Sequence, residues 1–151
     1  FIFNFPLGKI FIGDSGSYII GLYVSLCVIT LINKNLSLSP FVIVHILIYP
    51  SYELFRSFIR RILIGKSVLQ PDKQHLHSIL YIKNLSTFLS NNLKTNIITS
   101  MQIMFLQIIN FIYIINFYRD KEMIIAGIII FIIAYEIIYI IINHKIQNNQ
   151  D

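Results

Sequence analysis

Four stretches of the chain are apolar on all sides rather than along one stripe. They cover residues 16–32, 38–55, 97–118 and 123–142. A membrane-spanning helix needs roughly 20 mainly apolar residues, with about 17 to 25 acceptable, whereas a helix on a soluble protein shows a single apolar stripe. The pattern therefore predicts an all-α fold, a polytopic transmembrane helix bundle with about four membrane spans.

Polar segments separate these apolar stretches. Residues 33–37 and 119–122 are short connectors, and residues 56–96 form a long one. Short connectors join antiparallel neighbours, so we expect spans one and two to form one hairpin, spans three and four another, and residues 56–96 a loop between them. The start at Phe1, with no charged region before an apolar core, indicates an N-terminal truncation and no signal peptide. We expect residues 1–151 to be the C-terminal part of one multi-pass domain.

The composition agrees with a membrane protein. Hydrophobic residues make up 56% of the 151 residues and charged residues 13%, about half of the roughly 25% that soluble domains carry. The net charge of +5 would suggest a nucleic-acid partner in a soluble protein, but here the basic residues lie between apolar stretches. We therefore expect a lipid bilayer around the chain and no nucleic acid.

The basic residues are distributed unequally between the two sides of the predicted bundle. Nine of the 12 would lie on the side that holds both chain ends and residues 56–96. Cytoplasmic loops are enriched in Lys and Arg, so we expect that side to face the cytoplasm. The nine are Lys9, Arg56, Arg60, Arg61, Lys66, Lys73, Lys83, Lys94 and Lys145, against Lys34, Arg119 and Lys121 on the other side.

A small polar cluster directly precedes the first span. Gly13 and Gly16 permit unusual backbone angles and close approach to a ligand. Ser15 or Ser17 can cap the following helix, whose positive end suits a phosphate. Asp14 supplies the hard oxygen ligand that Mg²⁺ prefers beside phosphates. The competing interpretation is a capped turn at a membrane surface, and spacing alone favours it.

A second cluster lies within residues 56–77. Arg56 and Arg60 share a helix face, and guanidinium groups bind phosphate bidentately, although charges that only fix topology explain them as well. His75 and His77 would point the same way in an extended loop. They could donate hydrogen bonds to a diphosphate, or bind zinc with Asp72, although the usual third and fourth ligands are missing.

Three polar residues lie in or next to the spans. Glu53 is placed to pair with Arg56 or Arg60. Glu136 lies within the fourth span, where a carboxylate is a functional candidate by default, but hydrogen bonding in a structural role is the favoured interpretation. His45, in the second span, is interpreted as a packed or hydrogen-bonded histidine rather than a ligand.

Taken together, the two clusters resemble a known enzyme family. The resemblance rests on residues 8–17 (GKIFIGDSGS), residues 50–53 (PSYE), Arg60-Arg61 and residues 71–77 (PDKQHLH). In this order, with one hairpin between them, they are similar to the bacterial polyprenyl-phosphate N-acetylhexosamine-1-phosphate transferases, over roughly the first 80 residues. That family includes the peptidoglycan lipid-intermediate translocase and the enzymes that start O-antigen and teichoic-acid synthesis.

The resemblance implies an activity and a set of site residues. The family transfers a sugar 1-phosphate from a UDP-sugar to polyprenyl phosphate at the cytoplasmic face of the bacterial inner membrane, releases UMP, and needs Mg²⁺, with Mn²⁺ as the alternative ion. Asp14 would be the metal-binding or otherwise catalytic aspartate, and His75 and His77 would contact the diphosphate as catalytic residues. The substrate-binding residues would be Gly13, Gly16, Ser17, Arg60, Arg61 and Lys73.

The sequence also departs from the family pattern. Ser78 stands where the family commonly has a further histidine, and Glu53 stands where many members have aspartate. The family's paired aspartates lie in an earlier cytoplasmic loop, and this sequence has no Asp-Asp pair, so we expect the fragment alone to be inactive. A homodimer is one possible assembly. Two other classes stay open: a non-catalytic helix bundle or remnant of such an enzyme, and a transporter that uses Glu136 and His45.

Overall fold

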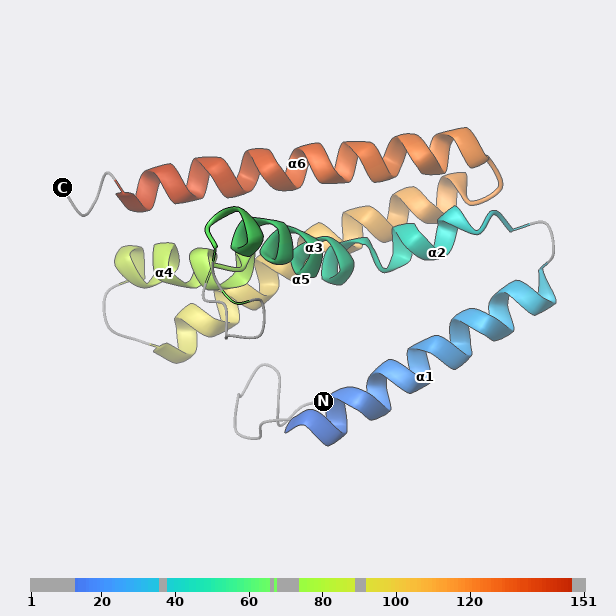
Figure 1. Ribbon diagram of the computed structural model, residues 1–151, viewed down its shortest axis with the longest axis horizontal. Helices are drawn as coiled ribbons and strands as arrows, with labels where there is room; N and C mark the ends of the chain where they lie inside the picture. Colours follow the sequence, from blue (N-terminus) through green and yellow to red (C-terminus); the bar gives the residue numbers. More distant parts are fainter. Residues whose placement is uncertain (1–12, 36–37, 66, 68–73, 89–91, 148–151) are drawn as a thin grey trace.

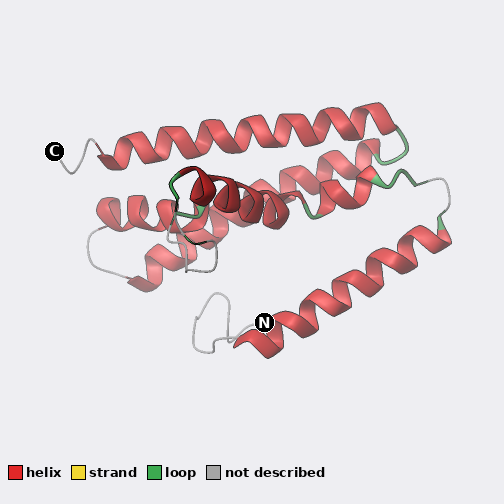
Figure 2. Cartoon of the chain, in the orientation of Figure 1, coloured by secondary structure: helices red, strands yellow, loops and turns green. Residues whose placement is uncertain are grey.

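The computed structural model describes residues 13–35, 38–65, 67, 74–88 and 92–147. Within these residues every regular element is a helix (Figure 2), which confirms the all-α prediction. The helices are α1 (Gly13–Lys34), α2 (Phe41–Ile46), α3 (Ile48–Leu63), α4 (Leu76–Phe88), α5 (Asn92–Phe117) and α6 (Lys121–Gln147).

Three of these helices, α1, α5 and α6, are long and apolar enough to cross a membrane. Helices α1 and α6 contain the first and fourth predicted spans, and α5 contains the third except for Tyr118. Figure 1 shows α5 and α6 running antiparallel with a tight turn between them, as the short connector 119–122 predicted. The amino end of α1, helix α4 and the carboxyl end of α6 lie toward the opposite end of the molecule.

The second predicted span, 38–55, is wrong as a single helix. It is divided at Leu47, where α2 ends and α3 begins. Pro50 explains the break, because proline has no N–H for the carbonyl four residues earlier and its ring clashes with that carbonyl, here that of Ile46. The chain therefore turns within the apolar stretch, and α3 leaves the direction of α2 (Figure 1).

Most of the described residues of the predicted loop 56–96 are helical. Helix α3 continues through the basic residues to Leu63, and Gly65 follows with a φ of 69°. Glycine adopts this left-handed conformation readily, and a glycine just past the last turn is a common helix end. After the segment around residues 66–73, helix α4 begins at Leu76.

The second of the two predicted hairpins, α5 with α6, is present, but the first is not. Helix α2 packs against α5 and α6, and α4 packs against the same pair. Helix α1 contains no buried residue and stands apart in Figure 1, so the predicted hairpin of spans one and two is wrong. A short connector alone does not make two helices pack together. Helix α1 is apolar on all sides, so it has no single face that would pack against α2.

The distribution of side chains is that of a membrane protein. On α3, Glu53 and Arg61 are buried, while Leu54 is 69% exposed. Many large apolar side chains of α5 and α6 are exposed as well, among them Ile115 and Ile140. Contiguous exposed apolar surface on this scale marks contact with a partner or a membrane, and the length of the helices indicates the membrane.

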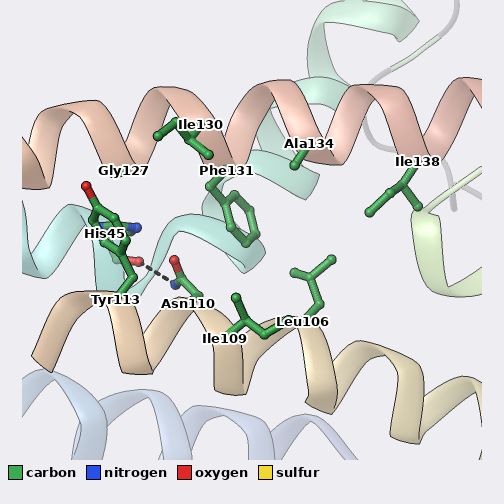
Figure 3. A pocket seen from close by; sticks show the side chains of 10 residues that line it. All are labelled: His45, Leu106, Ile109, Asn110, Tyr113, Gly127, Ile130, Phe131, Ala134 and Ile138. Carbon is green, nitrogen blue, oxygen red and sulfur yellow. Dashed lines mark hydrogen bonds between the residues drawn. The ribbon is translucent and has the colours of Figure 1, made fainter. Parts of the chain in front are cut away.

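Gly127 of α6 allows His45 and Tyr113 to approach the helix backbone (Figure 3). A Cβ atom at position 127 would lie 2.6 Å from Cε1 of His45 and closer still to the Tyr113 ring. We expect Gly127→Val to lower the free energy of unfolding by about 1–3 kcal/mol, the usual cost of overpacking. Thermal unfolding in detergent, followed by circular dichroism, measures the loss.

Gly21→Val is the matched control for this substitution. Gly21 lies in the apolar helix α1, and nothing lies within 4 Å of a Cβ atom built there. We expect the control to unfold at nearly the wild-type temperature. An equal loss in both variants would attribute the effect to valine in a helix and contradict the packing argument.

Candidate active site

The start of α4 is held by a carboxylate from α3. Glu53 is 8% exposed, and its Oε1 accepts a hydrogen bond of 2.9 Å from the backbone N–H of Leu76. Its Oε2 lies 2.8 Å from Nδ1 of His75. The carbonyl of His75 accepts the first intrahelical hydrogen bond, from Ile79 at 3.0 Å. The first N–H groups of a helix lack intrahelical partners, so Glu53 satisfies one of them and contacts His75 at the same time.

The two histidines of the motif lie together. The rings of His75 and His77 stack with centroids 5.5 Å apart and an interplanar angle of 8°. Both rings therefore lie on one side of the chain, as expected, but not because the backbone is extended. The segment is not an extended loop: His75 stands directly before α4 and His77 lies in its first turn, where the backbone bends.

Desolvation lowers the pKa of His77 below its ordinary value, and the nearby His75 acts in the same direction, while the charge of Glu53 opposes them. Much of the His77 side chain nevertheless faces outward. The neutral form is therefore favoured at neutral pH. In that form one ring nitrogen accepts and the other donates a hydrogen bond, so His77 can meet either kind of group on a ligand.

A second network anchors the chain just before the histidines. The hydroxyl of Tyr139 on α6 donates to the carbonyl of Gln74 at 3.3 Å. The guanidinium of Arg56 lies over the Tyr139 ring, 3.4 Å from its centroid, and its Nε donates to Glu136 at 2.7 Å. Tyr52 also donates to Glu136, at 2.9 Å. The favoured structural interpretation of Glu136 is therefore confirmed.

The basic residues of α3 do not all point to one place. Arg56 pairs with Glu136, so its predicted pairing with Glu53 is wrong, because the Glu53 carboxylate faces α4. Arg61 is buried, and its Nη1 donates to the carbonyl of Ser67 at 2.6 Å, which ties down the chain after α3. Arg60 is half-buried on the same helix. Lys73, like Asp72, lies outside the described residues.

The first cluster occupies the amino end of α1. Gly13 begins the helix with a φ of 68°, and Asp14 is exposed in the first turn. The helix thus starts before the predicted position, Gly16, so the cluster is its first turn rather than a preceding loop. Ser17 donates to the carbonyl of Gly13 at 2.9 Å and is therefore inside the helix, which makes its predicted capping role wrong.

The amino end of α1, which holds Asp14, and helix α4, which holds His77, lie toward the same end of the molecule (Figure 1), but no hydrogen bond or ion pair of the described residues joins Asp14 to the histidines. Among these residues no three metal-ligating side chains cluster, and zinc gains no support. Mg²⁺ is often held by one or two protein carboxylates together with substrate phosphates, and the Asp14 side chain is exposed.

A separate cavity of about 240 Å³ lies between α2, α5 and α6 (Figure 3). Apart from His45, Asn110 and the hydroxyl of Tyr113, its lining is apolar. The carbonyl of His45 accepts a hydrogen bond of 3.2 Å from Asn110, and His45 is buried, which confirms its interpretation as a packed histidine. Glu136 does not line this cavity; its carboxylate accepts hydrogen bonds from Arg56 and Tyr52.

The role of Glu53 was missed from the sequence. The motif that contains Glu53 stood out, but its partner lies 22 residues away, on the far side of the polar segment. The sequence shows a carboxylate in an apolar stretch and, separately, a histidine near a helix start. Neither feature predicts that the two side chains are in contact. Folding of α3 against the start of α4 is what joins them.

Comparisons with known proteins identify relatives of part of the chain. No protein-family model matches it, and no solved structure matches it. The undecaprenyl-phosphate alpha-N-acetylglucosaminyl 1-phosphate transferase of Thermotoga maritima is 33% identical over 76 residues, 50% of this chain and 25% of that protein. The decaprenyl-phosphate N-acetylglucosaminephosphotransferase of Mycobacterium leprae is 38% identical over 86 residues, 49% of this chain and 22% of that protein.

A third relative is the probable undecaprenyl-phosphate N-acetylglucosaminyl 1-phosphate transferase of Bacillus subtilis, 36% identical over 85 residues, 56% of this chain and 24% of that protein. The chain thus spans about a quarter of the length of the curated relatives it matches. About half of this chain is homologous to bacterial polyprenyl-phosphate N-acetylglucosamine-1-phosphate transferases, which confirms the family resemblance seen in its motifs.

Proposed function

We propose that this chain is part of an enzyme that transfers an N-acetylhexosamine 1-phosphate from a UDP-sugar to polyprenyl phosphate. The observation that carries the proposal is the 33–38% identity to transferases of this kind over about half of the chain. An oxygen of the polyprenyl phosphate would form a bond to the β-phosphorus of the UDP-sugar. The bridging P–O bond would break, and its electron pair would leave with UMP.

The proposed roles of the side chains follow from what this reaction needs. Phosphoryl transfer depends mainly on positioning and on neutralising charge around the phosphates. The stacked pair His75 and His77 would bind the diphosphate, with Arg60, Arg61 and Lys73 adding positive charge. Asp14 would hold Mg²⁺ together with phosphate oxygens, and Mn²⁺ is the alternative. Gly13, Gly16 and Ser17 would lie beside the same phosphates at the start of α1.

We place the site at the cytoplasmic face of a bacterial inner membrane. The support is the distribution of basic residues, nine of 12 on one side. Figure 1 agrees with a common side, because the start of α1, helix α4 and the end of α6 lie toward one end. A UDP-sugar is a cytoplasmic substrate, which fits this orientation. A homodimer stays a prediction.

The full-length protein, reconstituted in lipid nanodiscs, tests the proposal. We expect UMP release from one or more UDP-N-acetylhexosamines of a panel, only when polyprenyl phosphate and Mg²⁺ are both present, with the labelled sugar phosphate recovered in the lipid fraction. Omitting polyprenyl phosphate is the control that separates transfer from hydrolysis. A folded protein that releases no UMP with any sugar of the panel would favour the non-catalytic helix bundle.

A further inference from the structure

We propose that Glu53 is a positioning residue that fixes the ring proton of His75 on Nδ1 and so leaves Nε2 as the nitrogen that meets a ligand. The nature of that ligand, a nucleotide-sugar diphosphate, rests on the proposed function. The position of the proton does not, because it follows from the hydrogen bonds at the start of α4.

The first step concerns which atom holds the proton between Glu53 and His75. Nδ1 lies 2.8 Å from Oε2 of Glu53, so a proton must lie between them. An ionised carboxylate only accepts hydrogen bonds, and a neutral imidazole has one donor and one acceptor nitrogen. A carboxylic acid is ordinarily a stronger acid than an imidazolium, so the proton belongs to the ring.

The second step concerns why the Glu53 carboxylate is fixed in this orientation. Its other oxygen accepts from the N–H of Leu76 at 2.9 Å, at the helix end where N–H groups lack partners and negative charge is favoured. Glu53 is only 8% exposed, so water cannot readily replace either bond. Turning the carboxylate away from His75 would also remove this cap.

The third step concerns what the ring can then do. With Nδ1 hydrogen-bonded to Glu53, any proton that His75 gains or gives passes through Nε2. Neutral His75 accepts at Nε2, and protonated His75 donates there while Nδ1 keeps its bond to Glu53. Hydrogen bonds from a second residue fix the tautomer and the ring orientation of functional histidines in this way. Because His77 stacks on His75, its ring is positioned by the same contact.

Nitrogen-15 NMR of the full-length protein tests the proposal without an activity measurement. At about pH 9, the Nδ1 signal of His75 should have the shift of a protonated ring nitrogen and Nε2 that of an unprotonated one. The His75 signals are those absent from His75→Asn. Signals of the opposite tautomer in the wild type would overturn the proposal.

Glu53→Gln is the decisive variant. Glutamine has one accepting oxygen for two donors, and the N–H of Leu76 cannot change, whereas the imidazole can move its proton. We therefore expect the amide oxygen to keep the cap and the amide NH₂ to donate to Nδ1, which moves the proton of His75 to Nε2. We expect kcat for UMP release to fall by about 10-fold, the lower end for such partners.

Glu136→Gln is the matched control, because Glu136 is the neighbouring carboxylate that bonds to Arg56 and Tyr52 and does not contact His75. We expect its His75 signals to match the wild type. An unchanged tautomer in Glu53→Gln would overturn the proposal, as would the same change in Glu136→Gln. If Glu53→Gln does not accumulate, the wild-type spectrum still decides. The expected tautomer in a protein that releases no UMP would sustain this inference and remove the proposed function.

Discussion

Replacing Asp14 by Asn should reduce Mg²⁺-dependent UMP release by the full-length protein by about 10²- to 10³-fold, the usual loss when one group that stabilises developing charge is removed. The amide keeps the size of the side chain but removes its negative charge, and with it the hard ligand for Mg²⁺. Asp14 is exposed and makes no hydrogen bond or ion pair among the described residues, so folding should be unaffected. Initial rates at saturating substrates over a range of Mg²⁺ concentrations measure the effect.

Asp120→Asn supplies a matched control in the same chain. Asp120 lies in the α5–α6 turn, directly before α6 and toward the other end of the molecule from the start of α1 (Figure 1). Its Oδ1 accepts from the N–H groups of Glu122 and Met123 at 3.0 and 3.2 Å, and asparagine caps helices about as well. We expect wild-type turnover. Undiminished turnover in Asp14→Asn would remove Asp14 from the site, and equal losses in both variants would point to a general effect on the membrane helices.

The apolar pattern predicted the helices that cross the membrane far better than it predicted their ends and breaks. Span 123–142 lies inside α6, and span 97–118 lies inside α5 except for Tyr118, because about 20 mainly apolar residues leave few alternatives in a bilayer. The break at Leu47 depends on one residue, Pro50, whose effect falls one turn before it. A hydropathy average over residues 38–55 is hardly changed by one proline, so the whole stretch still resembles a single membrane span.

Polar residues in apolar stretches were the least predictable part. The sequence indicated that Glu136 was hydrogen-bonded, but not that Asn84 of α4 would donate to Gln102 of α5. The sequence also did not indicate that Arg56 pairs with Glu136 and not with Glu53, which is nearer in the sequence. That pairing depends on which faces of α3 meet α4 and α6, since Glu53 contacts the start of α4 and Arg56 contacts α6. Local charge spacing carries no information about such long-range packing.

Replacing His75 by Ala should lower kcat/KM for the UDP-sugar by about 10²-fold while the protein still accumulates in the membrane. Hydrogen bonds to charged groups contribute about 1.5–3 kcal/mol, and the loss of the ring also removes the stacking partner of His77. The cap of α4 survives, because Oε1 of Glu53 bonds to the backbone of Leu76 and not to the ring. Steady-state rates over a series of UDP-sugar concentrations, with membrane levels measured by immunoblot, give both quantities.

His144→Ala is the control for this variant, since His144 is an exposed histidine in the last turn of α6, toward the same end of the molecule as α4 (Figure 1). It should release UMP at the wild-type rate. Loss of membrane accumulation in His75→Ala would make the histidine a structural element of the α3–α4 contact. Unchanged kinetics would mean that the ring held by Glu53 does not meet the nucleotide sugar. A lowered rate with normal accumulation is the result that a ligand-binding histidine requires, because a histidine that only supports the fold would lower accumulation as well.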